Sequence, residues 1–171
     1  MNGLLNVGLS VALGIFILGS AYFIKMDSKS KPISQIPEFV STKFTQTNLR
    51  TGPSLDYPII YTYNQKQIPL KVIDIHEDWF QIKDIYGQQG WVYKNLVNSQ
   101  KYGIVLGQSN VYLTSSQKKI LAIIGEGNII KIINCESRLN LCKIEFSTAE
   151  YSSTPFIGWI NKSNLWGNTE D

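Results

Sequence analysis

The side chains best suited to chemistry in this chain are its only histidine, His76, and two cysteines, Cys135 and Cys142. A thiolate beside an imidazole is the nucleophile and base pair of cysteine hydrolases. Both cysteines, however, fall in a later part of the chain, and no other residues suggest a positioned base or an oxyanion hole. We therefore expect no catalytic residues, and His76, which precedes Glu77 and Asp78, is expected in an exposed turn.

Metal and cofactor sites also lack their usual residue patterns. The sequence contains neither a C-x-x-C nor an H-x-x-x-H spacing, and these spacings bring two metal ligands together on one turn or one helix face. We expect no metal site, no cofactor and no enzymatic activity.

Cys135 and Cys142 are instead predicted to pair with each other. Six residues separate them, and in a two-stranded hairpin this spacing brings the Cα atoms within disulfide distance. A bridge that closes so short a loop contributes on the order of 2–3 kcal/mol. Because disulfides persist in oxidising compartments, the pair favours export. Two reduced, buried thiols in a cytosolic barrel are the alternative.

Aromatic residues are the best candidates for binding a ligand. Tyr57, Tyr61, Trp91 and Tyr93 fall within one stretch of the chain, and flat amphipathic side chains suit sugar faces and extended peptides. Alternation along a strand places Trp91 and Tyr93 on one side and Val92 on the other. If Val92 is a core residue, the two rings line an outer groove.

Arg50 is the fifth candidate ligand residue, because a guanidinium group binds a carboxylate through two parallel hydrogen bonds. The alternative for Arg50 is structural, either stacking on the neighbouring tryptophan or pairing with Asp56 or Asp78. Trp91 has a structural alternative too, since it and Trp79 are suited to packing in the core or at the rim of a barrel.

These side chains are expected on short β-strands. Runs rich in β-branched and aromatic residues lie at 68–75, 79–83 and 90–92, and Gly87 provides a turn before the last of them. After Lys25, no window longer than eight residues shows the 3.6-residue period of a helix. The chain is therefore predicted to be all-β, with small barrels. Further runs lie at 120–124, 128–133, 142–146 and 158–160.

The sequence contains one folding unit twice. Gly-Trp-Val-Tyr-Lys-Asn-Leu occurs at 90–96 and Gly-Trp-Ile-Asn-Lys-Ser-Asn-Leu at 158–165. Earlier landmarks such as Asn48 and Asn110 lie 62 residues apart, and a six-residue insertion near 148–155 explains the offset of 68 at the Gly-Trp pair. A duplicated small unit indicates a binding protein rather than a single-site enzyme.

The N-terminus contains an apolar run. Residues 3–24 carry no charged side chain, and a helix of that length crosses a hydrocarbon core of about 30 Å. The length, and the lack of a preceding basic residue, predict a transmembrane anchor at 1–25. A cleaved signal peptide is the alternative, because residues 19–21 are small. Residues 26–44 contain Pro32 and Pro37 and are predicted to be a linker that ends in a first strand near 39–44.

The distribution of charge along the chain argues against a nucleic-acid ligand. Net charge is +3, and the sixteen Lys and Arg residues are scattered along the sequence. Nucleic-acid binding normally needs a concentrated basic stripe. We therefore expect no nucleic-acid ligand.

The first unit resembles the bacterial SH3 domain. It contains, in order, Asn-Leu-Arg-Thr-Gly-Pro-Ser at 48–54, Tyr-Pro at 57–58, Asp-Trp at 78–79 and Gly-Trp-Val at 90–92. The second unit is similar but degenerate, with Tyr112 in place of the arginine and Leu141 in place of the first tryptophan. The pair is similar to membrane-anchored or secreted tandem SH3-like proteins of Gram-negative bacteria.

The resemblance implies a five-stranded, partly open barrel in each unit, located in the cell envelope. It also implies binding of peptidoglycan, peptide or protein partners rather than catalysis. We expect SH3-like barrels at 45–99 and 100–168, presented as a non-enzymatic cell-envelope binding module. The alternative is a membrane-tethered scaffold whose barrels mediate assembly of a protein complex without binding cell wall.

Two indicators disagree about the side of the membrane on which the bulk of the protein lies. Lys25, Lys29 and Lys31 follow the apolar run and no charged side chain precedes it, which by the positive-inside rule keeps the bulk of the protein in the cytoplasm. The cysteine pair and the resemblance favour export. We expect an inner-membrane anchor with the bulk in the periplasm, or export after cleavage, and the cytoplasm-facing orientation stays open. Neither the ligand nor the oligomeric state follows from the sequence.

Overall fold

The computed structural model describes residues 37–147 and 154–169, which form β-strands joined by turns and short 3₁₀ segments. The expected anchor at 1–25, and the linker up to residue 36, lie outside these residues. Within the part of the chain that is described, no helix is long and apolar enough to span a bilayer.

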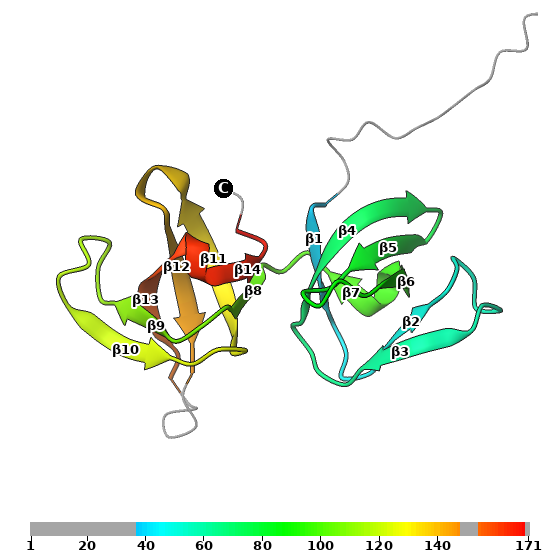
Figure 1. The fold of residues 1–171 in the computed structure, drawn as a ribbon, viewed down its shortest axis with the longest axis horizontal. Coiled ribbons are helices and arrows are strands. Elements are labelled where there is room, and N and C mark those ends of the chain that lie inside the picture. The colour runs from blue at the N-terminus through cyan, green and yellow to red at the C-terminus, as the bar shows by residue number, and fades with distance from the viewer. Residues whose placement is uncertain (1–36, 148–153, 170–171) are drawn as a thin grey trace, which may run out of the picture. The chain divides into compact units, whose positions relative to one another are not determined.

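The first sheet is antiparallel and contains seven strands in the order β3-β2-β6-β5-β4-β1-β7 (Figure 1). Its short first strand lies inside the range predicted as linker and pairs with both β4 and β7. The strands are β1 (Phe39–Thr42), β2 (Thr47–Arg50), β3 (Ile59–Tyr63), β4 (Pro69–His76), β5 (Trp79–Lys83), β6 (Gln89–Tyr93) and β7 (Val97–Asn98).

The second sheet repeats this arrangement, in the order β10-β9-β13-β12-β11-β8-β14. Each of its strands occupies the place of a strand in the first sheet, from β8 in the place of β1 to β14 in the place of β7. The strands are β8 (Tyr102–Val105), β9 (Ser109–Tyr112), β10 (Ile120–Ile124), β11 (Ile129–Glu136), β12 (Leu141–Phe146), β13 (Phe156–Asn161) and β14 (Leu165–Gly167).

The prediction of all-β units is confirmed for the residues that the structure describes, but each sheet has seven strands where the resemblance implied five. The two additional strands are the terminal segments of each unit. In the first sheet, Ser41 of β1 lies opposite Asn98 of β7, so the start and end of the unit pair with each other. Segments of four and two residues are too short to show a clear alternation of polar and apolar side chains.

Each sheet encloses its own core. Alternate residues of the central strands point inward, and the first core is built around Leu49, Leu70, Ile82 and Val92. Three positions of the second core match these by order along the chain and are fully buried as well: Val111, Ile144 and Ile160. The two clusters share no residue, and each is built from residues of its own unit.

The repeated Gly-Trp pair is explained by the close approach of two strands. A Cβ atom on Gly90 would lie 2.7 Å from Leu49 Cγ and 2.8 Å from the Arg50 carbonyl oxygen, both on β2. In the second sheet, a Cβ atom on Gly158 would meet Val111 and lie 3.0 Å from the Tyr112 carbonyl oxygen on β9. Only glycine fits where the strands cross this closely.

The repeated lysine connects the same hairpin in both sheets. The Lys94 N–H donates to the Asp78 carbonyl oxygen at 2.9 Å, and the Lys162 N–H donates to the Asn140 carbonyl oxygen, also at 2.9 Å. The Lys94 ammonium group additionally donates to the carbonyl oxygen of Glu77. The motif is therefore a structural element that joins the end of β6 or β13 to the preceding hairpin turn.

Candidate functional site

Strand β6 presents two aromatic side chains on the outside of the first barrel. Val92 is fully buried in the core, and its neighbours Trp91 and Tyr93 are half-buried on the other face of the strand. The Tyr93 ring packs against Trp79, with 5.3 Å between ring centroids. Trp79 itself is only 7% exposed, so its role in the structure is packing beneath Tyr93.

Arg50 holds the loop that follows β2. Its Nη1 atom donates hydrogen bonds to the carbonyl oxygens of Leu55 at 3.0 Å and Tyr57 at 2.7 Å. In the sheet, Arg50 lies directly opposite Trp91 of β6. The guanidinium group therefore fixes the backbone of Tyr57 on the side of the sheet that carries the half-buried Trp91 ring, and neither Asp56 nor Asp78 accepts these bonds.

Gly52 provides the surface on which the Tyr57 ring rests. A Cβ atom on Gly52 would lie 2.6 Å from Cδ1 and Cε1 of that ring, so any other residue would displace it. The loop is closed further by Ser54 and Asp56, since the Ser54 hydroxyl donates to Asp56 Oδ2 at 3.1 Å. Tyr57 remains 46% exposed, so the ring is held in place yet open to a ligand.

His76 joins this group from the end of β4. Its ring meets Trp91 edge-on, with 6.3 Å between ring centroids. It is exposed, as predicted, but it belongs to the same surface as the candidate ligand residues. We define the aromatic surface by its five members: Arg50, Tyr57, His76, Trp91 and Tyr93.

Tyr61 lies apart from the aromatic surface. It is directly opposite Leu49, whose side chain is in the core, whereas Arg50 points to the other face of β2. The Tyr61 ring packs edge-on against Tyr63 at 4.9 Å between centroids. The structure thus brings together four of the five candidate ligand residues and separates the fifth.

Asp84 is a buried polar residue that the sequence reasoning missed. Its Oδ1 accepts hydrogen bonds from the N–H groups of Tyr86 at 3.0 Å and Gln88 at 2.9 Å, and its Oδ2 accepts one from the Tyr63 hydroxyl at 3.2 Å. Burial, and then the negative charge of Asp84, raise the pKa of the Tyr63 phenol well above its usual value. The aspartate before Tyr86-Gly87 is the signal for such a capped turn.

Metal-ligating side chains do not gather at this surface. Across residues 37–147 and 154–169, no three His, Cys, Asp or Glu side chains lie close enough together to hold a metal ion.

The comparison with known families matches this part of the chain. Residues 43–98 match the bacterial SH3 domain family. This segment is a bacterial SH3 domain. Three members of its aromatic surface come from the motifs that carry the resemblance, Arg50 and Tyr57 from the first half of the domain and Trp91 from its last long strand.

Comparisons with whole proteins find only distant similarity. No curated protein matches the chain. Among solved structures, NlpC2 from Trichomonas vaginalis is 13% identical, with a TM-score of 0.33 over 77% of this chain and 48% of that one. NlpC1 from Trichomonas vaginalis is 14% identical, with a TM-score of 0.32 over 77% of this chain and 46% of that one. The chain therefore spans less than half the length of either protein.

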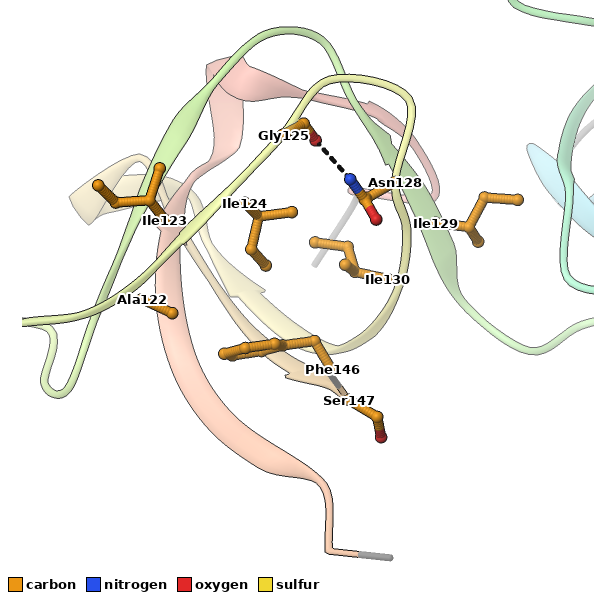
Figure 2. Close-up of a pocket in the computed structure, with 9 residues that line it drawn as sticks. All are labelled: Ala122, Ile123, Ile124, Gly125, Asn128, Ile129, Ile130, Phe146 and Ser147. Atoms are coloured by element: carbon orange, nitrogen blue, oxygen red, sulfur yellow. Dashed lines mark hydrogen bonds between the residues drawn. The ribbon is translucent and has the colours of Figure 1, made fainter. Parts of the chain in front are cut away.

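The second unit keeps one residue of the aromatic surface, a tryptophan at position 159, and differs at the other positions that can be compared. Tyr112 lies opposite Trp159, in the positions of Arg50 and Trp91, so no guanidinium group is available there. Leu141 lies opposite Asn161, in the positions of the Trp79 and Tyr93 pair. A hollow of about 240 Å³ in this unit, shown in Figure 2, is lined mainly by isoleucines and Phe146 and contains none of the predicted ligand residues.

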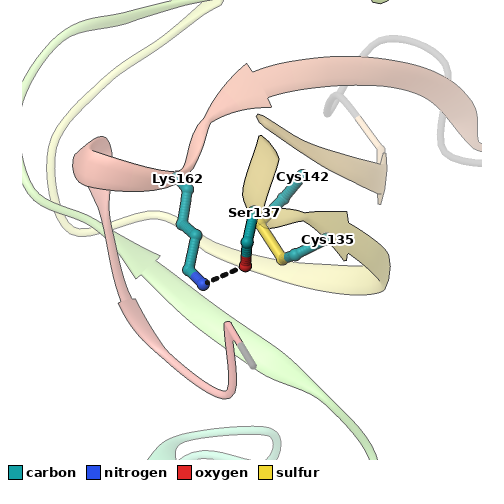
Figure 3. Close-up of a disulfide and its surroundings, with 4 residues drawn as sticks. All are labelled: Cys135, Ser137, Cys142 and Lys162. Atoms are coloured by element: carbon teal, nitrogen blue, oxygen red, sulfur yellow. Dashed lines mark hydrogen bonds between the residues drawn. A yellow bond between two sulfur atoms is a disulfide. The ribbon is translucent and has the colours of Figure 1, made fainter. Parts of the chain in front are cut away.

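The two cysteines are joined by a disulfide in the second unit (Figure 3). Cys135 of β11 lies directly opposite Cys142 of β12, with 4.0 Å between Cα atoms, and both side chains are buried. In the SH3 domain the matching positions hold the Ile75 and Phe80 pair. The disulfide therefore replaces an apolar cross-strand contact next to the hairpin turn.

Proposed function

We propose that the chain is a non-enzymatic binding module of the cell envelope, and that its SH3 domain binds peptidoglycan through the aromatic surface. The observation that carries this proposal is the pair of hydrogen bonds by which Arg50 fixes Tyr57 on the face that carries the half-buried Trp91 and Tyr93 rings. The match of residues 43–98 to bacterial SH3 domains supports a role in binding.

The chemistry of the surface suits a glycan with attached peptide. Half-exposed tyrosine and tryptophan rings offer apolar faces to sugar rings and lose little side-chain entropy on binding. Because Tyr57, Trp91 and Tyr93 are already held by their neighbours, little further ordering is needed. Arg50 adds a positive charge beside the rings, which attracts the carboxylates of a stem peptide.

The proposed location is the periplasm, with residues 1–25 as an inner-membrane anchor or a cleaved signal. The disulfide between Cys135 and Cys142 supports this, because such bonds persist in oxidising compartments. A segment that follows the anchor would hold the SH3 domain close to the bilayer, within reach of the cell wall.

Sedimentation with purified peptidoglycan tests the function. The full chain in detergent is mixed with peptidoglycan and centrifuged, and the bound fraction is measured for the wild type and for Trp91→Ala/Tyr93→Ala. We expect the affinity of the variant to fall about tenfold, since each stacked ring contributes roughly 0.5–1.5 kcal/mol beyond its area. Both substitutions leave Val92 and the core in place.

The second unit offers a matched control. Trp159→Ala/Asn161→Ala changes the equivalent positions outside the SH3 domain and is expected to bind peptidoglycan like the wild type. If the wild type itself stays in the supernatant, binding to the cell wall is refuted. The membrane-tethered scaffold, which assembles protein partners through the barrels, is then the function to test.

A further inference from the structure

Strand β10 is an open, apolar edge of the second sheet. It ends the strand order of that sheet, and among the residues that the structure describes it pairs only with β9. Its sequence is Ile-Leu-Ala-Ile-Ile, with Ile120 51% and Ile123 59% exposed. Natural sheets usually protect such an edge with lysine, proline or a bulge; β10 contains neither lysine nor proline, and its register shift, between Ile120 and Ala122, is confined to the start of the strand.

The charges that flank β10 select the direction in which another strand can pair with it. Lys118 and Lys119 precede the strand, and Glu126 follows it after one glycine. When two copies of β10 run antiparallel, the lysines of each copy lie beside the glutamate of the other. A parallel arrangement would place lysines beside lysines, and like charges opposite each other destabilise a sheet.

Antiparallel pairing of a strand with its own copy generates a closed, two-fold symmetric interface. With the axis near Ala122, Ile120 of one copy lies opposite Ile124 of the other. The hollow of about 240 Å³ begins beside Ile124, and Figure 2 shows Ile124 and Ile130 directed into it while Ile123 points away. The hollow therefore gives the isoleucine of the second copy a place to enter beside Ile124 and Ile130.

We infer that the chain forms a homodimer in which the β10 strands of two copies pair antiparallel and join the two second-unit sheets into one. The divergent unit thus has a role that does not require the aromatic surface. Two SH3 domains held in one dimer engage a polymeric ligand with a higher apparent affinity than either alone. The dimer itself is independent of whether that ligand is peptidoglycan.

Light scattering after size-exclusion chromatography of the full chain in detergent tests the dimer. At protein concentrations on the order of 100 μM, a dimer with a micromolar dissociation constant is almost fully formed. We expect the wild type to be dimeric and Ile123→Lys to be monomeric, because a lysine on the exposed edge opposes strand pairing. Ile123 is exposed, so circular dichroism is expected to show an unchanged fold.

Three further variants make the result specific. Ile60→Lys places the same substitution on β3, the matching edge of the SH3 domain, where Ile60 is also exposed, and is expected to stay dimeric. Glu126→Lys is expected to weaken the dimer at least fivefold, and Lys118→Glu/Lys119→Glu combined with Glu126→Lys is expected to restore it.

Two outcomes overturn the inference. The first is a monomeric wild type, which includes the case in which residues 1–36 of the same chain cover β10. The second is an Ile123→Lys variant that remains dimeric, which would assign self-association to another part of the chain. Neither outcome bears on peptidoglycan binding by the SH3 domain, which the sedimentation experiment measures separately.

Discussion

Arg50 connects the structure of the SH3 domain to its proposed ligand surface. One nitrogen of its guanidinium group binds two carbonyl oxygens in the loop that carries Tyr57. The position of the Tyr57 ring then depends on the hydrogen bonds from Arg50 to the loop and on the contact of the ring with Gly52. The structural and ligand-binding roles considered for Arg50 are therefore compatible, because fixing Tyr57 is itself a contribution to the surface.

Substitution of Arg50 tests how firmly the loop is held. We expect Arg50→Ala to lower the free energy of unfolding of the SH3 domain by about 1 kcal/mol, the usual net contribution of such hydrogen bonds. The free energy of unfolding of Arg50→Lys is expected to lie between those of the wild type and Arg50→Ala, since an ammonium group lacks the planar fork of a guanidinium. Urea unfolding followed by tryptophan fluorescence measures the change.

The control for Arg50 is an exposed ion pair in the same domain. Lys71 and Glu38 lie 3.4 Å apart on the surface, and Lys71→Ala is expected to change stability by less than about 0.5 kcal/mol. An Arg50→Ala variant as stable as Lys71→Ala would show that the loop is held by other contacts, such as the bond between Ser54 and Asp56.

Alternation along one strand could be predicted from the sequence, whereas contacts between distant residues could not. The outward positions of Trp91 and Tyr93 followed from placing Val92 in the core, and the structure has this arrangement. The contact of Tyr57 with Gly52 depends on how a loop folds back on itself. The separation of Tyr61 depends on which face of β2 its partner residue occupies.

At the scale of the elements, the Gly-Trp pair marks the place where β6 closely approaches its neighbour in the sheet, β2. Substitution of Gly90 by alanine tests this close approach. The added methyl group would lie 2.8 Å from a backbone oxygen of β2, which cannot move without disturbing the sheet. We expect Gly90→Ala to destabilise the SH3 domain by about 1–3 kcal/mol, the usual cost of overpacking, as measured by urea unfolding.

A matched control for Gly90→Ala is available in a loop. A Cβ atom on Gly107 would meet no atom within 4 Å, so Gly107→Ala is expected to be neutral within about 0.5 kcal/mol. Gly158→Ala should reproduce the effect of Gly90→Ala in the second unit. An unchanged stability for Gly90→Ala would mean that the strands can separate at little cost.

The long strands could be predicted from their apolar patterns and the first strand was expected near 39–44, whereas the short closing strand β7 could not be predicted. The predicted strands at 68–75, 79–83 and 90–92 correspond to β4, β5 and β6, where β-branched and aromatic residues are concentrated. Strands β1 and β7 are defined only by their pairing with each other and with β4. That pairing is a long-range contact, which a local pattern does not contain.

At the scale of the whole molecule, the two sheets share one strand order and differ in what they carry. The SH3 domain has the aromatic surface, and the second unit has the disulfide and the open β10 edge. That the second unit is also an SH3 domain stays a prediction, since only residues 43–98 match the family. This division fits a molecule in which one unit binds the ligand and the other supplies stability and self-association.

The state of Cys135 and Cys142 in cells is expected to report the compartment of the protein. If the bulk of the chain is in the periplasm, the disulfide forms there, and both thiols are protected from a maleimide–polyethylene glycol reagent added during denaturing lysis. After reduction, the chain should gain two polyethylene glycol groups on a gel. Cys135→Ser is the control, because its single remaining thiol should react without reduction.

The same bond is expected to stabilise only the second unit. Closing the short loop between β11 and β12 contributes about 2–3 kcal/mol, so Cys135→Ser/Cys142→Ser should lower the stability of the second unit by that amount. The urea transition of the SH3 domain should stay unchanged, because its core is separate.

In the labelling experiment, reaction of both wild-type cysteines without reductant would contradict the periplasmic location. It would place the two thiols in a reducing compartment, the orientation that the lysines after residue 24 favour.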